Sequence, residues 1–316
     1  MIVVISLNSA IDRTLVLKSA MEYDGINYVQ DSYTAAGGRG INIARAIHSL
    51  GGRCNVLGFC AGNNGRTLKD TLTGLGIGHD FTEIAGETRV NTQIVDVDGG
   101  QTYFNEHGPE MTDADYLRFL EKLKLYLAPE NLIVLAGSIP PGMTEKQYLR
   151  IVKTIKRTGA KLLIDSDGNT LQKVMPYKPD FIKPNSRELS ILTGQPRTLD
   201  PEETLQRIQP LIDGDEVANI CASIGKNGAV FAFDHEVPLY VVASDEDLAR
   251  RNPSAIGNGD AMLGAIAHAY EQNMSNEELA KFAVAMGTAT AALPGTQMAT
   301  MKDAYYVYEN LKVYTM

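Results

Sequence analysis

The sequence predicts an α/β fold, in which a mostly parallel β-sheet is covered by helices on both faces and a small separate β-sheet is inserted as a lid. Short apolar runs alternate with amphipathic helical patterns over most of the 316 residues. Two segments, residues 14–34 and 88–107, instead alternate β-branched and aromatic residues with polar ones and show no helical period. No internal repeat or low-complexity tract interrupts this organisation.

Short apolar runs of four to seven residues are the expected buried strands of the main sheet. They cover residues 2–7, 54–59, 131–137, 161–165, 180–183 and 219–224. A further apolar hairpin over residues 229–242 is expected to extend this sheet at one edge.

Apolar residues at helical spacing predict helices between these strands. The clearest of them cover residues 43–50, 116–123 and 148–155. The last of these begins at a capping box formed by Thr144 and Gln147, and a further helix opens at Ser275 with Glu278 in the same box position.

The two segments without helical period predict the inserted sheet. The second carries an Asp98-Gly99-Gly100 turn between alternating residues, a pattern typical of a β-hairpin. We therefore expect residues 12–35 and 87–107 to form the lid, and residues 1–11, 36–86 and 108–316 to form the α/β core.

Composition and charge exclude several classes of partner. Acidic residues outnumber basic ones 38 to 29, and the resulting net charge of −9 gives no general attraction for nucleic acid or anionic lipid. Cys54, Cys60 and Cys221 form no zinc pattern and fit a reducing compartment. The first residues read as a strand and no segment is apolar enough to span a bilayer, so we expect a cytoplasmic protein.

Polar residues follow most of the predicted strands. Ligands of an open parallel sheet bind beyond the carboxyl ends of its strands, so these residues are expected on one rim. Polarity there is also ordinary for loops of an α/β fold. The residues are Asn8, Asp12, Gly137, Ser138, Asp165, Asp167, Lys183, Asn185, Glu188 and the loop Gly225-Lys226-Asn227-Gly228.

Two glycine turns precede helices and could each bind an anion. Residues 254–260 place Gly257 and Gly259 just before a helix, where consecutive backbone N–H groups and the positive end of the helix dipole meet. Asp260 is then either an N-cap or a carboxylate beside the anion. The second turn, at Gly37 and Gly38, could equally serve close helix packing.

Several other common functional motifs are absent, because their residues do not occur at the required spacing. The sequence contains no P-loop, and its GRGINI segment does not continue as a dinucleotide-binding fingerprint. Ser138 lacks the flanking glycines of a nucleophile elbow. The five histidines are scattered without metal-ligand spacing.

Seven motifs in order resemble those of the ribokinase-like (PfkB) carbohydrate kinases: LNSAID, AAGGRGINIARAIHSLGG, ETRVN, LAGSIPPG, IKPNSRE, ASIGKNGA and IGNGDA. The nearest branch is the 1-phosphofructokinase and tagatose-6-phosphate kinase group. The resemblance implies ATP-dependent phosphoryl transfer to a ketohexose phosphate, foremost fructose 1-phosphate to fructose 1,6-bisphosphate. Tagatose 6-phosphate is the alternative acceptor, and an unphosphorylated sugar or nucleoside is a more distant one. A non-catalytic sugar-phosphate binder or sensor is the alternative outside catalysis.

The resemblance also implies roles for individual residues and partners. Asp260 would be the catalytic base, with the N–H groups of Gly257, Asn258 and Gly259 as an anion hole. Asn185 and Glu188 would organise Mg²⁺ largely through water. A monovalent cation and a homodimer formed through the lid are further expectations. The sugar side would use Asp12, Gly37, Gly38, Arg39, Asn42, Arg89 and Ser138, and the nucleotide side Lys183, Asn185, Ser223, Gly225, Lys226, Asn227 and Gly228.

Three positions depart from the usual motifs of the family. Arg39 stands where a lysine is usual, which changes reach and hydrogen-bond geometry. Tyr28 stands where the branch often has an arginine, so one phosphate contact is absent from that motif. Asn258 places a larger side chain at the predicted anion hole. These departures bear on the substrate, and they motivate the sensor alternative, whereas the retained Asp260 argues for catalysis.

Overall fold

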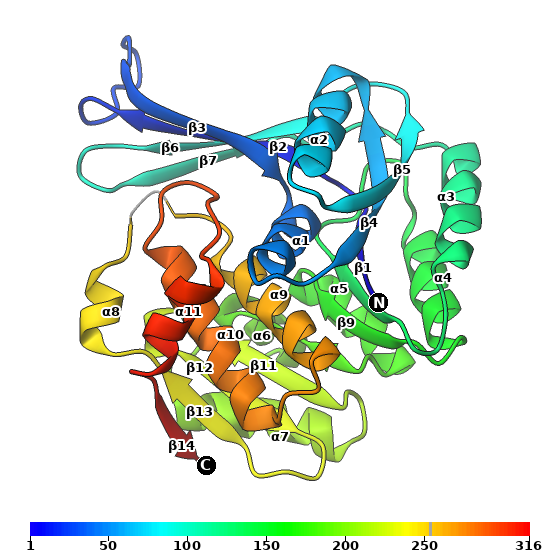
Figure 1. Ribbon diagram of the computed structural model, residues 1–316, viewed down its shortest axis with the longest axis vertical. Helices are drawn as coiled ribbons and strands as arrows, with labels where there is room; N and C mark the ends of the chain where they lie inside the picture. Colours follow the sequence, from blue (N-terminus) through cyan, green and yellow to red (C-terminus); the bar gives the residue numbers. More distant parts are fainter. Residues whose placement is uncertain (253–254) are drawn as a thin grey trace.

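The computed structural model describes residues 1–252 and 255–316, and it contains a ten-stranded and a four-stranded sheet (Figure 1). The strands of the large sheet are β1 (Ile2–Ser6), β4 (Cys54–Ala61), β5 (Gly78–Ile84), β8 (Leu132–Ala136), β9 (Lys161–Asp165), β10 (Phe181–Ile182), β11 (Asn219–Ser223), β12 (Ala229–Phe233), β13 (Leu239–Val242) and β14 (Lys312–Thr315). Those of the small sheet are β2 (Ala10–Leu17), β3 (Val29–Gly37), β6 (Arg89–Val95) and β7 (Gln101–Asn105).

β1 lies in the interior of the large sheet, and the chain adds later strands on both sides of it. The order is β14-β13-β12-β11-β10-β9-β8-β1-β4-β5, and all neighbours from β5 to β11 are parallel. Ile2 pairs with Cys54 of β4 on one side and with Leu132 of β8 on the other. Because the chain turns to opposite sides of β1, a crevice opens at the carboxyl ends of these strands, where ligands of such sheets bind.

Helices cover both faces of the large sheet. One face carries α1 (Arg39–Ser49), α2 (Gly62–Gly74), α9 (Asn258–Glu271) and α10 (Asn276–Ala291). The other carries α3 (Asp113–Leu125), α4 (Glu145–Lys156), α5 (Gly168–Val174), α6 (Ser186–Thr193) and α7 (Pro201–Asp213). The remaining helices are α8 (Asp245–Ala249) and α11 (Met301–Tyr308). Alternation along β1 builds both layers, since Ile2 and Val4 face one cluster and Val3 and Ile5 the other.

The predicted fold class is confirmed. Each of the six predicted buried strands is present, as are the predicted helices and both predicted capping boxes. The hairpin of residues 229–242 forms β12 and β13, but β14 pairs outside it and is the true edge. We did not predict β5 or β14. Both lie at sheet edges and are partly or largely exposed, so neither carries a continuous apolar run.

The small sheet projects from the body of the molecule as an arm (Figure 1). Its order is β3-β2-β6-β7, with β2 parallel to β6 and the outer pairs antiparallel. Its strands begin and end slightly outside the predicted lid, since β2 starts at Ala10 and β3 ends at Gly37. The division of the chain into a core and a lid stays a prediction.

The three cysteines lie in the body of the fold. Each is buried and unbridged. Burial raises the pKa of the Cys221 thiol to about 12, so it stays protonated at neutral pH. Among the described residues, no helix is long and apolar enough to cross a membrane.

Close contact between α1 and α9 determines where the predicted base lies. A Cβ atom placed on Gly264 of α9 would lie 2.7 Å from the Ala46 Cβ and 3.0 Å from the Ile43 carbonyl oxygen of α1. Glycine at 264 therefore lets the two helices approach backbone to backbone. This contact brings residues of α1 beside the first turn of α9.

We expect Gly264→Ala to destabilise the fold and to lower activity. Glycine-to-alanine in a helix normally stabilises by up to ~1 kcal/mol, but overpacking against a rigid backbone costs about 1–3 kcal/mol. Thermal unfolding should therefore show a lower Tm. Gly74→Ala is the matched control, because a Cβ there meets nothing within 4 Å. An unchanged Tm for Gly264→Ala would contradict the close-packing argument.

Candidate active site

A cavity of about 760 Å³ lies at the carboxyl ends of the central strands, and both sheets contribute to its wall. Most of the predicted site residues line it, including Asp12, Asn42, Arg89 and Asp260. A second cavity of about 290 Å³ adjoins it. The two share four wall residues, which are Ser223, Arg251, Asn258 and Gly259.

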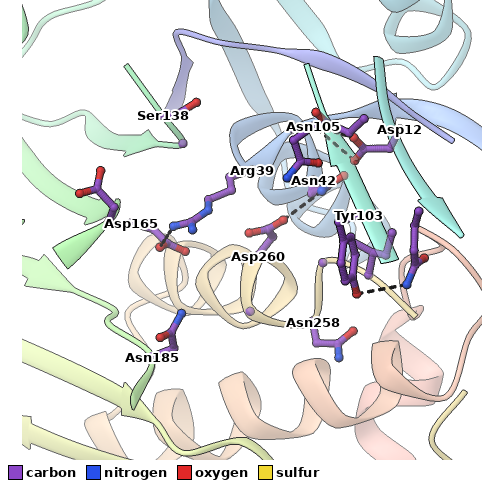
Figure 2. Close-up of a pocket in the computed structure, with 18 of the residues that line it drawn as sticks. Asp12, Arg39, Asn42, Tyr103, Asn105, Ser138, Asp165, Asn185, Asn258 and Asp260 are labelled. Atoms are coloured by element: carbon purple, nitrogen blue, oxygen red, sulfur yellow. Dashed lines mark hydrogen bonds and ion pairs between the residues drawn. The ribbon is translucent and has the colours of Figure 1, made fainter. Parts of the chain in front are cut away.

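Asp260 lies in the first turn of α9 and is buried. The N-cap of α9 is Gly257, in the left-handed region at φ 86°, so the interpretation of Asp260 as the N-cap is wrong. Its Oδ2 accepts a hydrogen bond of 2.9 Å from the Asn42 Nδ2 of α1 (Figure 2). Arg45 donates to the Asn42 Oδ1 at 3.5 Å, which leaves the Asn42 amide nitrogen directed at Asp260.

The environment of Asp260 makes it a proton acceptor suited to neutral pH. Burial, and then the negative charge of Asp165, raise the pKa of Asp260 to about 7, although Arg39, Asn42 and Lys183 oppose the shift. A carboxyl group with this pKa is ionised in part at neutral pH and binds a proton far more readily than an exposed aspartate. Asp260 therefore has the properties of a general base.

The first turn of α9 offers backbone N–H groups to an anion. Gly257, Asn258 and Gly259 precede Asp260 on the cavity wall, and the helix dipole adds positive potential there. A Cβ on Gly259 would lie 3.4 Å from the Lys183 Nζ, so a cation adjoins this turn. The Asn258 side chain points away from Asp260 (Figure 2). The Asn258 side chain therefore does not fill the space beside the Asp260 carboxylate.

Charged residues on the wall of the cavity form a compact network. Arg39 contacts the Asp165 Oδ1 at 2.9 Å and the Glu188 Oε1 at 3.0 Å, and Lys183 contacts the Asp165 Oδ2 at 3.1 Å. Asp165, above all, raises the pKa of Arg39. Burial disfavours the charged form of Lys183, but Asp165 and Glu188 outweigh it and raise its pKa. Both cations stay charged and neutralise the carboxylates.

The donor atoms of Asn185 and Glu188 suit a Mg²⁺ ion reached through water. The Asn185 side chain caps α6, accepting from the backbone N–H groups of Arg187 and Glu188. Glu188 in turn accepts from the Asn185 N–H and from Arg39. No group of three or more His, Cys, Asp or Glu residues in the described ranges could hold a metal directly. Lone pairs on Glu188 remain for water molecules of an ion that keeps its own hydration.

Asp12 projects into the cavity from β2. Its Oδ2 accepts from the Gly38 N–H at 3.2 Å, and its Oδ1 accepts from the Asn91 Nδ2 at 2.9 Å. A Cβ on Gly37 would lie 2.1 Å from the Asp12 Oδ2, so only glycine fits beside this carboxylate. Gly37 thus lies behind Asp12, whereas Gly38 itself lines the cavity.

Two rows of polar side chains cross the small sheet on its cavity face. In one row Asp12 pairs with Asn91, which pairs with Asn105. In the other, Thr14 Oγ1 donates to the Gln93 Oε1 at 3.3 Å, and the Gln93 Nε2 donates to the Tyr103 hydroxyl at 3.1 Å.

We did not predict the members of these rows on β6 and β7 as site residues. The available signal was the period of two, which places residues 91 and 93 on one face of a strand and residues 103 and 105 on one face of the next. The alternation of apolar and polar residues marks these segments as strands, but it does not show that their polar face lines the cavity.

Arg89 and Ser138 lie on the cavity wall beside the small sheet. Two N–H groups of Arg89 donate to the Asn8 carbonyl oxygen at 3.2 and 3.0 Å, and a third donates to the Glu106 carbonyl at 3.1 Å. These carbonyls fix the guanidinium and leave two of its five N–H groups for a ligand. The Asn8 amide donates to the Ser138 hydroxyl at 3.1 Å.

The loop after β11 lines the second cavity with Ser223, Gly225, Lys226 and Gly228. A Cβ on Gly228 would lie 2.2 Å from the Val241 carbonyl oxygen, so glycine is required where the loop passes β13. Asn227 turns away, and its amide donates to the Leu199 carbonyl at 2.9 Å. It is not among the residues that line either cavity.

The cavity thus brings together the Asp260 carboxylate, the first turn of α9 and a polar sheet face. Known proteins are similar to this chain in sequence and fold. 1-Phosphofructokinase from Borreliella burgdorferi is 32% identical over 291 residues, which are 92% of this chain and 92% of that protein. Phosphofructokinase-2 from Escherichia coli in complex with substrates and products is similar at a TM-score of 0.90 and 26% identity, over 98% of both chains. The structure of that enzyme in complex with fructose-6-phosphate is similar at a TM-score of 0.87 and 25% sequence identity, again over 98% of both chains.

A family model covers nearly the whole chain. The model of the pfkB family carbohydrate kinases matches residues 1–303, which include every strand of both sheets except β14, together with Asp260 and the first turn of α9. The chain therefore belongs to the pfkB family of carbohydrate kinases.

Proposed function

We propose that this carbohydrate kinase transfers the γ-phosphoryl group of ATP to a hydroxyl of a ketohexose phosphate, with fructose 1-phosphate as the preferred acceptor. The observation that carries the proposal is the buried Asp260 in the first turn of α9, with a pKa of about 7. It lines the larger cavity and directly follows Asn258 and Gly259, which line both cavities. A kinase needs a base and an anion site at the point where its two substrates meet.

Each part of the step would fall to a named group. The Asp260 carboxylate would accept the proton of the acceptor hydroxyl while that oxygen bonds to the γ-phosphorus. The bond from phosphorus to the bridging oxygen would break, and its electron pair would leave with ADP. The N–H groups of Gly257, Asn258 and Gly259 would stabilise the charge on the equatorial oxygens.

The larger cavity suits a sugar phosphate. Hydroxyl groups would find acceptors and donors in the polar rows of the small sheet, at Asp12, Asn91 and Asn105. The phosphate would take the two N–H groups that Arg89 has left, because a fixed guanidinium suits a doubly charged oxyanion.

The smaller cavity suits the nucleotide. Leu248, Met262 and Val284 give it an apolar wall for a base, and Lys226 adds a cation. Mg²⁺ brought with ATP would neutralise phosphate charge, and Glu188 and Asn185 would orient its waters. A requirement for a monovalent cation stays a prediction.

Fructose 6-phosphate is a second candidate acceptor. It is the ligand in a solved complex of Escherichia coli phosphofructokinase-2, to which this chain is similar over nearly its full length. Tagatose 6-phosphate is a third candidate acceptor, and a sensor that binds sugar phosphates without turning them over is the candidate function outside catalysis. Asp260 argues against the sensor, since a pure binder gains nothing from a carboxylate held out of water.

The small sheet would act as a lid over the sugar, and a homodimer would form through it. Large apolar side chains on this sheet and its loops are exposed, among them Ile26, Val97 and Phe104. Phe104 lies between the cavity-lining Tyr103 and Asn105, so alternation along β7 directs it to the opposite face. Exposed apolar side chains such as these favour self-association.

Turnover of a sugar panel tests the proposed function. We expect MgATP-dependent ADP release with fructose 1-phosphate at a higher kcat/KM than with fructose 6-phosphate, tagatose 6-phosphate or free fructose. A preference for one of the other phosphates would reassign the acceptor. Tight sugar-phosphate binding without turnover of any of them would favour the sensor.

We predict that Asp260→Ala lowers kcat by roughly 10²–10⁴-fold while sugar-phosphate affinity stays near that of the parent protein. Since Asp260 accepts a proton only as a carboxylate, kcat/KM of the parent protein should rise with pH up to about 7 and then level off. The exposed Asp70 of α2 provides the control variant Asp70→Ala. An active Asp260→Ala, or a flat profile across pH 7, would remove Asp260 from the role of base.

We predict that Arg89→Ala raises KM for phosphorylated sugars by about tenfold or more, because a charge-assisted contact is lost, with little change in kcat. Steady-state kinetics with fructose 1-phosphate and with free fructose measure the effect. Arg13→Ala is the control, since Arg13 is exposed on β2 and does not line the cavity. Equal losses on both sugars would mean that Arg89 does not bind the phosphate.

A further inference from the structure

Arg251 lies where the two cavities meet, at a position that no sequence motif marks. It follows α8 and lines both the larger and the smaller cavity. Of the four residues shared by the two walls, only Arg251 carries a formal charge. Any group that passes from a ligand in one cavity to a ligand in the other crosses this shared wall.

Acidic side chains outnumber basic ones on the wall of the larger cavity. Five carboxylates line that cavity, namely Asp12, Asp165, Asp167, Glu188 and Asp260. Its four cations are Arg39, Arg89, Lys183 and Arg251. Since both proposed substrates carry phosphate, the site must bind anions against an excess of negative charge.

Three of these cations already have partners. Arg39 and Lys183 form ion pairs with Asp165 and Glu188, and Arg89 donates three of its N–H groups to backbone carbonyls. Within residues 1–252 and 255–316, the Arg251 guanidinium has no hydrogen bond or ion pair. All five N–H groups of its guanidinium can therefore bind a ligand.

The backbone holds Arg251 at the border while its side chain stays uncommitted. Its N–H donates to the Leu248 carbonyl oxygen at 3.3 Å, at the end of α8. The next residue, Asn252, donates its N–H to the Ala291 carbonyl oxygen at 2.7 Å, which ties the segment to the end of α10. Lys226 also faces the smaller cavity, but it does not reach the larger one.

We propose that the Arg251 guanidinium binds the γ-phosphoryl group of ATP and stabilises its negative charge during transfer. The inference deepens the proposed function and rests on it for the identity of the transferred group. In the step, the acceptor oxygen bonds to phosphorus, its proton goes to Asp260, and the bridging oxygen leaves with ADP. Arg251 donates N–H groups to the equatorial oxygens, opposite the backbone N–H groups of the α9 turn.

Arg251→Gln, Arg251→Lys and the control Arg250→Gln test this role. Arg250 is the adjacent arginine, but its guanidinium lies over the Tyr306 ring at 5.1 Å and it lines neither cavity. Kinetics should show kcat of Arg251→Gln lowered by roughly 10²–10³-fold, with KM for the sugar phosphate changed by less than about threefold. Arg251→Lys keeps the charge without the planar fork and should recover part of the loss. Arg250→Gln should retain the parent kcat.

Nucleotide binding gives a readout that does not depend on the sugar. We expect the parent protein to bind AMP-PNP, an ATP analogue with a γ-phosphoryl group, more tightly than ADP in the presence of Mg²⁺. Arg251→Gln should lose about tenfold or more in AMP-PNP affinity and little in ADP affinity, because the contact is made to the γ-group alone. A lower Tm with equal loss for both nucleotides would indicate a structural role and overturn the proposal.

The two readouts separate this inference from the proposed acceptor. If the parent protein turns over none of the sugar phosphates, the proposed function fails, whereas selective loss of AMP-PNP binding in Arg251→Gln still supports Arg251 as the γ-phosphoryl ligand. If the parent protein is active and Arg251→Gln keeps its kcat within about threefold, the function stands and the role of Arg251 is refuted.

Discussion

The structure depends on holding one carboxylate, Asp260, out of water. Burial of an ionised group is costly unless polar partners surround it, and the chain supplies the Asn42 amide at 2.9 Å with Arg39 and Lys183 behind it. That arrangement requires α1 and α9 to approach closely, which glycine at position 264 permits. The packing of these two helices and the proton affinity of Asp260 therefore depend on the same contact.

The chain has a net charge of −9, yet basic side chains line its cavity in two groups with different surroundings. Arg39 and Lys183 neutralise Asp165 and Glu188 and keep this part of the cavity wall near electrical balance. Arg89 and Arg251 face the space that ligands would occupy. Local placement of a few basic groups thus replaces the general positive field of a nucleic-acid-binding protein.

The sequence predicts the interior of this fold better than its margins. Buried strands such as β1 and β8 are continuous apolar runs, so periodicity locates them, whereas the exposed edge strand β14 has no such run. The glycine turn before Asp260 is a local signal and marks a helix terminus. Contacts such as those of Arg39 and the exposure of Arg251 depend on residues distant in sequence, and only the folded chain brings them together.

The position of α9 late in the chain has a consequence for biosynthesis. Its first residue, Asn258, emerges after both the small sheet and the parallel strands of the large sheet have been made. Domains generally fold as units, and synthesis proceeds from the N-terminus. A chain released before α9 is made therefore lacks the carboxylate proposed to deprotonate the sugar, and it could not carry out the proposed transfer.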